Sequence, residues 1–186
     1  MLRIIAGEWR GRKLSAPQGD ATRPTADRTR ETLFSMLVSR LGSFEGLKVA
    51  DLFAGSGALG LEALSRGAAS ALFVEQDAAA IRALRANIAA LHAQPRCDVR
   101  AASVLTLGVA REPMDVIFLD PPYGTGAGAV AIDKLVRLGW IDESTWVCLE
   151  TAAKEVPQVR SCTVDADRTV GKALITLMKK AASAPA

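Results

Sequence analysis

Residues 51–60 read Asp51-Leu52-Phe53-Ala54-Gly55-Ser56-Gly57-Ala58-Leu59-Gly60. The apolar run at 47–53 predicts a strand that enters this stretch, and residues 58–66 predict a helix that Gly67 ends. A G-x-G-x-x-G pattern at such a strand-to-helix turn is typical of nucleoside-cofactor sites, because glycines let the backbone bend tightly and approach a ligand. Glycine turns are also often purely structural, so the surrounding sequence has to support the interpretation.

The remainder of the chain alternates between apolar runs of strand length and periodic runs of helix length. Strands are predicted at residues 70–75, 97–101, 114–120 and 145–150, helices at 78–91 and 132–138, and a closing pair of strands at 159–164 and 172–178. This alternation predicts an α/β fold with a doubly wound, mainly parallel sheet.

The first 24 residues read as an appendage to this sheet. Short strands are predicted at residues 2–5 and 12–14, a loop at 15–24 and a helix at 26–41. We therefore expect a basic hairpin and loop at 1–24, one domain at 25–180 and a short tail at 181–186.

Charge is unevenly distributed along the chain. The net charge is +3, but residues 1–40 carry +4 and the remainder carries −1. A basic N-terminal segment on a near-neutral body favours a polyanionic partner, although a solvated surface gives the same pattern.

Several classes of protein are disfavoured by composition. No apolar run is long enough to span a bilayer or to form a signal peptide, so we expect a cytoplasmic protein without a membrane partner. Cys97, Cys148 and Cys162 form no CxxC pair, and His92 is the only histidine. This pattern favours neither a disulfide framework nor a metal site, so no metal is expected. His92 is interpreted as a surface residue at a helix end.

Carboxylates flank the glycine turn. Asp51 immediately precedes it, and Glu75 ends the next predicted strand, 20 residues after Gly55. A carboxylate at the position of Glu75 can accept hydrogen bonds from a ribose diol. Asp51 would repel the pyrophosphate of NAD but attract the ammonium of S-adenosylmethionine, which favours S-adenosylmethionine as the cofactor. Asp51 can also bond amides of the glycine turn, and both roles can hold together.

A second loop follows the apolar strand at 114–120 and reads Asp120-Pro121-Pro122-Tyr123. Consecutive prolines restrict the backbone to one extended path, so the Asp120 carboxylate and the Pro121 carbonyl become two fixed acceptors. Two such acceptors can take both protons of an exocyclic amine, and Tyr123 can stack on a base. The loop predicts methyl transfer to a base amine, with catalysis by orientation and electrostatics. The structural alternative is a plain turn with a core tyrosine.

Residues 51–57 and 120–123 together resemble the amino-methyltransferases that carry a DPPY motif. More narrowly, two N-terminal blocks resemble the bacterial RsmD family: Arg3-Ile4-Ile5-Ala6-Gly7-Glu8-Trp9-Arg10-Gly11-Arg12-Lys13-Leu14 and Arg23-Pro24-Thr25-Ala26-Asp27-Arg28-Thr29-Arg30-Glu31-Thr32-Leu33-Phe34. The resemblance implies a Rossmann-like class I S-adenosylmethionine-dependent methyltransferase fold, with a seven-stranded, mostly parallel sheet. It also implies methylation of N2 of a guanine in small-subunit (16S) ribosomal RNA, either naked or within an assembling ribosomal particle.

The resemblance also assigns residues to roles. The cofactor pocket receives Phe53, Gly55, Gly57, Glu75, Gln76 and Asp77, and the target base receives Asp120, Pro121 and Tyr123. The helix start at 23–25 is expected over the methionine end of the cofactor, with Arg28 or Arg30 near the substrate. Arg10, Arg12, Lys13 and Arg23 are expected to contribute to RNA binding, the first three on phosphates. We expect the protein to be a monomer.

One position departs from the common methyltransferase pattern. Many of these enzymes carry an acidic or amide residue after the third strand, which bonds the cofactor's adenine. The chain has Ala102-Ser103 there, and Ser103 can either bond the adenine through its hydroxyl or cap the next helix. Two other functions stay open from the sequence: a DNA adenine-N6 methyltransferase, and a nucleic-acid binder that has lost catalysis.

Overall fold

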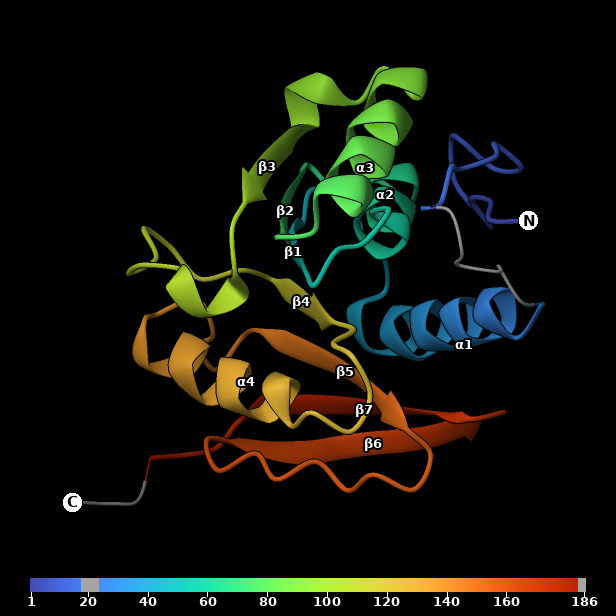
Figure 1. The fold of residues 1–186 in the computed structure, drawn as a ribbon. Helices are drawn as coiled ribbons and strands as arrows, with labels where there is room; N and C mark the ends of the chain where they lie inside the picture. Colours follow the sequence, from blue (N-terminus) through green and yellow to red (C-terminus); the bar gives the residue numbers. More distant parts are fainter. Residues whose placement is uncertain (18–23, 184–186) are drawn as a thin grey trace.

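The sheet predicted from the alternating pattern is present in the computed structural model, which describes residues 1–17 and 24–183 (Figure 1). The elements are α1 (Pro24–Leu41), β1 (Lys48–Leu52), α2 (Ala58–Ser65), β2 (Ser70–Glu75), α3 (Ala78–Ala90), η1 (Gln94–Arg96), β3 (Cys97–Ala101), η2 (Val104–Thr106), β4 (Val116–Leu119), α4 (Ala127–Arg137), β5 (Trp146–Ala152), β6 (Cys162–Val170) and β7 (Ala173–Lys180). The strand order is β3-β2-β1-β4-β5-β7-β6. Strands β1 to β5 pair in parallel, and β7 runs antiparallel to both β5 and β6.

Side chains along the central strands alternate between two cores, one on each face of the sheet. On one face, Val49, Phe73 and Phe118 pack in the same core as buried residues of α1, α2 and α3. On the other face, Ile117 and Leu149 pack with buried residues of α4. The central strands are therefore covered on both faces, which leaves their carboxyl ends as the place where loops can form a site.

The N-terminal segment packs onto the main domain. Leu2, Ile4 and Leu14 are buried in the same core as α1 and α2. Arg3 and Lys13 form an isolated antiparallel bridge, so the two stretches pair as expected, but neither forms the strand predicted at 2–5 or 12–14. The division of the chain at residue 24 stays a prediction, because the segment and the sheet share one core.

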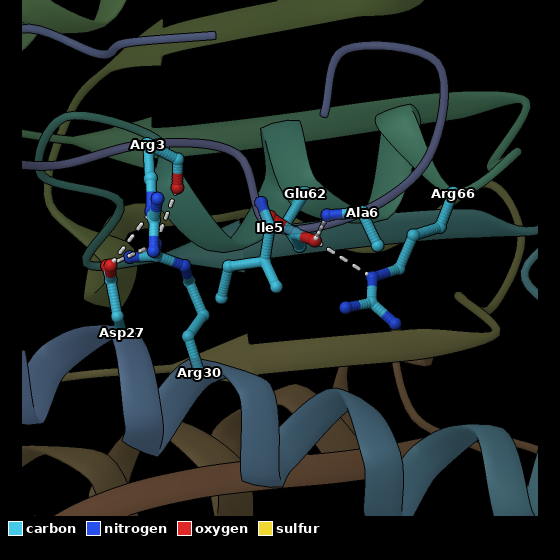
Figure 2. A network of polar contacts seen from close by, with 7 residues as sticks. All are labelled: Arg3, Ile5, Ala6, Asp27, Arg30, Glu62 and Arg66. Atoms are coloured by element: carbon cyan, nitrogen blue, oxygen red, sulfur yellow. Dashed lines mark hydrogen bonds and ion pairs between the residues drawn. The ribbon is translucent and has the colours of Figure 1, made fainter. Parts of the chain in front are cut away.

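Glu62 of α2 is the buried acceptor that fixes this segment (Figure 2). Its Oε2 accepts from the Ile5 amide at 2.8 Å, and its Oε1 accepts from the Ala6 amide at 3.0 Å. The Arg66 guanidinium donates to the same Oε1 at 2.9 Å, so the buried charge is paired. Because removing one partner of a buried pair leaves the others unsatisfied, this contact ties the segment's position to the stability of the domain.

Three predicted boundaries were wrong. Helix α4 begins at Ala127, five residues earlier than expected, because Gly126 adopts a left-handed cap with φ of 68°. Helix α1 begins at Pro24, since proline fits the first helical position. The first closing strand is Cys162–Val170, with a bulge between Val164 and Ala166 that lets this edge strand continue beyond the expected end.

Two findings concern sites that the fold could carry. Over residues 1–17 and 24–183, no helix combines the length and apolar character needed to cross a membrane. Over the same ranges, no group of three or more His, Cys, Asp or Glu side chains is placed to hold a metal ion. Cys97, Cys148 and Cys162 are free thiols, and His92 follows the C-terminus of α3 with a left-handed φ of 53°.

We expect Glu62→Gln to destabilise the protein by about 3 kcal/mol, because the amide offers a donor where Ile5 and Ala6 both donate. Urea unfolding measures this difference. The control is Glu112→Gln, which weakens an exposed ion pair with Lys48 and should change stability by about 0.5 kcal/mol or less. Equal effects of the two substitutions would contradict the assigned role of Glu62.

Candidate active site at the carboxyl edge of the sheet

The two loops singled out in the sequence meet at one edge of the sheet. Strands β1 and β4 are parallel neighbours, with Leu52 opposite Leu119. The glycine turn begins directly after Leu52, and the Asp120-Pro121-Pro122-Tyr123 loop, called here the DPPY loop, begins directly after Leu119. The register therefore places the start of one loop beside the start of the other, as a shared site requires.

The glycine turn has backbone geometry that most side chains disfavour. Phe53, Gly55 and Gly57 have φ values of 60°, 57° and 85°, all in the left-handed region. A Cβ added at Gly57 would lie 2.3 Å from the Leu84 side chain, so helix α3 packs directly against the turn. A Cβ added at Gly55 would meet nothing within 4 Å, so this part of the turn is open to a ligand.

Glu75 holds the turn in place. Its Oε2 accepts from the Gly55 amide at 2.8 Å, and its Oε1 accepts from the Gln76 and Asp77 amides, each at 2.9 Å. Gln76 and Asp77 are exposed, and Asp77 caps α3 by accepting from the Ala80 amide at 2.9 Å. The carboxylate expected at the ribose is thus oriented by the turn that it supports.

Asp51 lies behind the turn, and its side chain is almost completely buried. Its Oδ2 accepts from the Gly60 amide at 2.8 Å, so Asp51 bonds the first turn of α2 rather than the expected glycine turn before it. Burial raises the pKa of Asp51 to about 8, the hydrogen bond from Gly60 lowers it, and the Glu75 carboxylate raises it. A positive charge near this carboxyl would favour its ionised form.

Three groups gather at the DPPY loop: Asp120, Tyr123 and Glu150. Tyr123 is 47% exposed, and its hydroxyl donates to Glu150 Oε1 at 2.7 Å. Asp120 is accessible to solvent but enclosed by protein on most sides. This desolvation, together with the Glu150 and Asp51 carboxylates, raises the pKa of Asp120 well above its usual value. Burial likewise raises the pKa of Glu150, against the lowering effect of the Tyr123 hydrogen bond.

Pro121 packs on α4, whereas Pro122 is exposed. Pro121 is buried, and the Thr125 hydroxyl donates to the Pro122 carbonyl at 2.9 Å. A Cβ added at Gly128 of α4 would lie 3.1 Å from the Pro121 ring, so the helix start and the loop are in close contact. Within the described ranges neither the Asp120 carboxylate nor the Pro121 carbonyl has a hydrogen-bond partner, so both acceptors are available.

The electrostatics of this edge fit a cationic cofactor. Across the described part of the chain, none of the ion pairs includes Asp51, Asp120 or Glu150. A pyrophosphate would disfavour the ionised forms of these carboxyls, whereas a sulfonium with an amino-acid ammonium would favour them and be attracted. The open face of Gly55 and the unneutralised carboxyls therefore suit S-adenosylmethionine better than NAD.

The candidate RNA-binding cations are placed differently from one another. Arg10, Arg12 and Lys13 are exposed on the N-terminal segment, and Arg12 also donates to the Ala90 carbonyl at 2.7 Å. Arg28 is exposed on α1. Arg23 lies outside the described residues.

Arg30 is buried, contrary to its expected place near the substrate (Figure 2). It donates to the Arg3 carbonyl at 2.7 Å and to Asp27 Oδ1 at 3.0 Å, so its guanidinium fastens the N-terminal segment to α1. The Arg30 guanidinium is thus engaged within the protein, and Arg28 is the exposed member of the pair, so the expected contact with the substrate stays a prediction for Arg28. The sequence could not separate them, because both lie on one polar stretch of helix.

Two further residues bear on the site. Ser103 accepts from the Leu105 amide at 3.3 Å and caps η2, so the capping alternative is present in the structure. Its expected contact with the cofactor's adenine stays a prediction. Glu150 was missed by the sequence analysis, although an acidic residue near the end of a predicted parallel strand was a usable signal.

The sheet order, the glycine turn after β1 and the DPPY loop after β4 define a class I methyltransferase fold. The chain matches the family described as Conserved hypothetical protein 95 over residues 2–179. It is 41% identical over 150 residues to Ribosomal RNA small subunit methyltransferase D of Escherichia coli strain K12, covering 81% of this chain and 74% of that protein. The chain belongs to this family, the RsmD family.

Solved structures agree with the fold. The Escherichia coli protein yhhF, described as a methyltransferase, superposes with a TM-score of 0.84 at 36% identity, covering 97% of this chain and 98% of that one. Magnesium protoporphyrin IX methyltransferase from Synechocystis, solved with bound SAM, has a TM-score of 0.68 at 15% identity, covering 88% of this chain and 87% of its own. At that identity the second likeness shows the fold alone.

We expect Asp51→Asn to stabilise the free protein increasingly as the pH rises from about 4 to about 8. A carboxyl whose pKa is raised on folding binds its proton more tightly when folded, so its contribution to stability falls across this window. Asparagine can still accept from the Gly60 amide but does not titrate. The measurement is the free energy of unfolding of both proteins at several pH values. A difference that does not change with pH would contradict the raised pKa.

Proposed function

We propose that this protein transfers a methyl group from S-adenosylmethionine to N2 of a guanine in small-subunit (16S) ribosomal RNA. The observation that carries the proposal is the register of β1 and β4, which sets a cofactor-type glycine turn beside two free acceptors and an exposed tyrosine. The relative from Escherichia coli named Ribosomal RNA small subunit methyltransferase D supports the choice of substrate.

The residues of the glycine turn would hold the cofactor. Glu75 would bond the ribose, Gln76 and Asp77 would lie beside it, and Phe53, Gly55 and Gly57 would shape the backbone around it. Asp51, buried behind the turn, would attract the ammonium, and Ser103 would lie near the adenine. When bound, S-adenosylmethionine supplies a methyl group on a positively charged sulfur.

The DPPY loop would prepare the amine. An aromatic amine is a poor nucleophile because its lone pair is delocalised into the ring. The Asp120 carboxylate and the Pro121 carbonyl would accept the two N2 protons and turn the lone pair out of the ring plane. Tyr123 would stack on the base, and Asp120 can accept the proton released after transfer.

The exposed cations of the N-terminal segment would hold the RNA backbone. Arg10, Arg12 and Lys13, with Arg28 on α1, are exposed and can pair with phosphates. A domain of this size offers little surface for reading a long sequence, so a folded RNA within an assembling ribosomal particle is the proposed substrate. We further propose a cytoplasmic monomer.

The test is to methylate small-subunit particles and, separately, naked 16S RNA and DNA with isotopically labelled S-adenosylmethionine. Digestion of each product to nucleosides identifies the methylated base by mass. We expect label in N2-methylguanosine from ribosomal RNA. Label in N6-methyladenine from DNA would establish the DNA methyltransferase instead, and a protein that binds nucleic acid without any transfer would be the inactive binder.

We expect Asp120→Ala to lower kcat by about 100- to 1000-fold, the range found when one transition-state acceptor or donor is removed. The dissociation constant for S-adenosylmethionine should stay within about twofold, because Asp120 faces the base rather than the glycine turn. Single-turnover kinetics and calorimetry measure the two quantities. The control is Asp167→Ala on the exposed strand β6, which should leave both unchanged. Retained turnover in Asp120→Ala would refute the role of Asp120.

A further inference from the structure

Glu150 lies beside Asp120 at the carboxyl edge of the sheet. Strands β4 and β5 are parallel, with Leu119 opposite Leu149, so Asp120, the first residue after β4, comes next to the β5 position of Glu150. Phe118 lies two residues before Asp120 and Cys148 two residues before Glu150, and both side chains pack in the core on the α1 face. Side chains alternate along a strand, so Glu150 belongs to that face, and Asp120 extends the same alternation one residue past the end of β4.

The contacts of Glu150 leave part of its carboxylate unused. One oxygen accepts from the Tyr123 hydroxyl at 2.7 Å. The other oxygen has no hydrogen-bond partner within residues 1–17 and 24–183, and no cation of these ranges pairs with Glu150. A pocket of about 250 Å³ opens on the α4 side of Glu150, lined by Pro121, Pro122, Tyr123 and Glu150 together with the start of α4, and Asp120 is not part of its lining.

If Glu150 only held the Tyr123 hydroxyl, its charge would be desolvated without need. A neutral glutamine would accept the same hydrogen bond without a charge to desolvate, and without a second charge beside Asp120. The neighbouring carboxylates of Asp120 and Glu150 therefore suit a ligand that carries two hydrogen-bond donors side by side.

We propose that Glu150 selects guanine by accepting the N1–H of the target base while Asp120 accepts a proton of its N2 amine. A base stacked on the Tyr123 ring would bring its edge to the carboxylate that the Tyr123 hydroxyl touches. Guanine presents N1–H and the N2 amine side by side, whereas adenine presents an acceptor at N1 and cytosine an acceptor at N3. The inference rests on the proposed function, since it assigns the selection of the base at that same site.

The sharpest test uses 2-aminopurine, which keeps the amine at C2 but has an unprotonated N1. The substrate is small-subunit ribosomal RNA in which 2-aminopurine replaces the methylated guanine, after the nucleoside digestion has located it. We expect the wild-type protein to methylate guanine at least about 100-fold more efficiently, because the Glu150 carboxylate would face an acceptor in the analogue. In Glu150→Gln, the amide can donate to the unprotonated N1.

The glutamine oxygen would stay on the Tyr123 hydroxyl, so its NH2 would face the guanine N1–H, donor against donor. Glu150→Gln should therefore lower kcat/KM for guanine by about 100-fold and leave kcat/KM for 2-aminopurine equal or higher, so that the preference collapses. The control is Tyr123→Phe, which removes the hydroxyl and keeps the stacking ring. If Glu150 only held Tyr123, both variants would lower the two rates in the same proportion. An unchanged preference in Glu150→Gln, or equal losses on both substrates, overturns the inference.

The two levels of the proposal fail separately. If the wild-type protein places no methyl group on guanine N2, the proposed function is wrong. If it does so and Glu150→Gln keeps the wild-type preference, only the role of Glu150 is wrong. An unchanged dissociation constant for S-adenosylmethionine in each variant shows that the fold and the cofactor turn are intact.

Discussion

Parallel pairing of β1 with β4 is the constraint on which the site depends. Two parallel neighbours end at the same edge of a sheet. The pairing of Leu52 with Leu119 therefore fixes the distance between the start of the glycine turn and the start of the DPPY loop. A shift of one residue would also turn every side chain to the opposite face and send Asp51 away from helix α2. The apolar cores on both faces specify this register, so the geometry of the site follows from the packing of the fold.

The cofactor turn is also tied to the N-terminal segment. Asn87 of α3 is buried, and its amide donates to the carbonyls of Ser15 and Ser56, each at 2.9 Å. Its oxygen accepts from the Ser15 amide at 2.7 Å. One side chain therefore joins the end of the described N-terminal segment to the middle of the glycine turn. The segment that carries the exposed cations is thus part of the support of the turn.

Local sequence predicted the parts of the site that depend on local chemistry. The glycine turn and the DPPY loop could be read directly, because backbone freedom and proline restriction act over a few residues. The burial of Arg30 could not be read, since it depends on where the Arg3 carbonyl lies after the segment folds onto α1. The start of α4 was missed because a run of small residues reads as a loop, while packing of Gly128 against the DPPY loop favours a helix. Glu150 became informative only once the β4–β5 register had set it beside Asp120.

The carboxyl edge combines acidic groups that oppose one another in the free protein. Desolvation raises the pKa values of Asp51, Asp120 and Glu150, so each is easier to protonate than an ordinary carboxyl. Repulsion from Glu75 adds to the shift of Asp51, and repulsion from Glu150 and Asp51 adds to the shift of Asp120. A cationic cofactor and a base edge rich in N–H donors would both favour the ionised forms. Linkage then requires that ionisation of these groups favour the two ligands in return. The same three carboxyls therefore lower the stability of the free protein and would stabilise its complex with a methyl donor and an amine. This is the arrangement expected where a fold gives up stability for function.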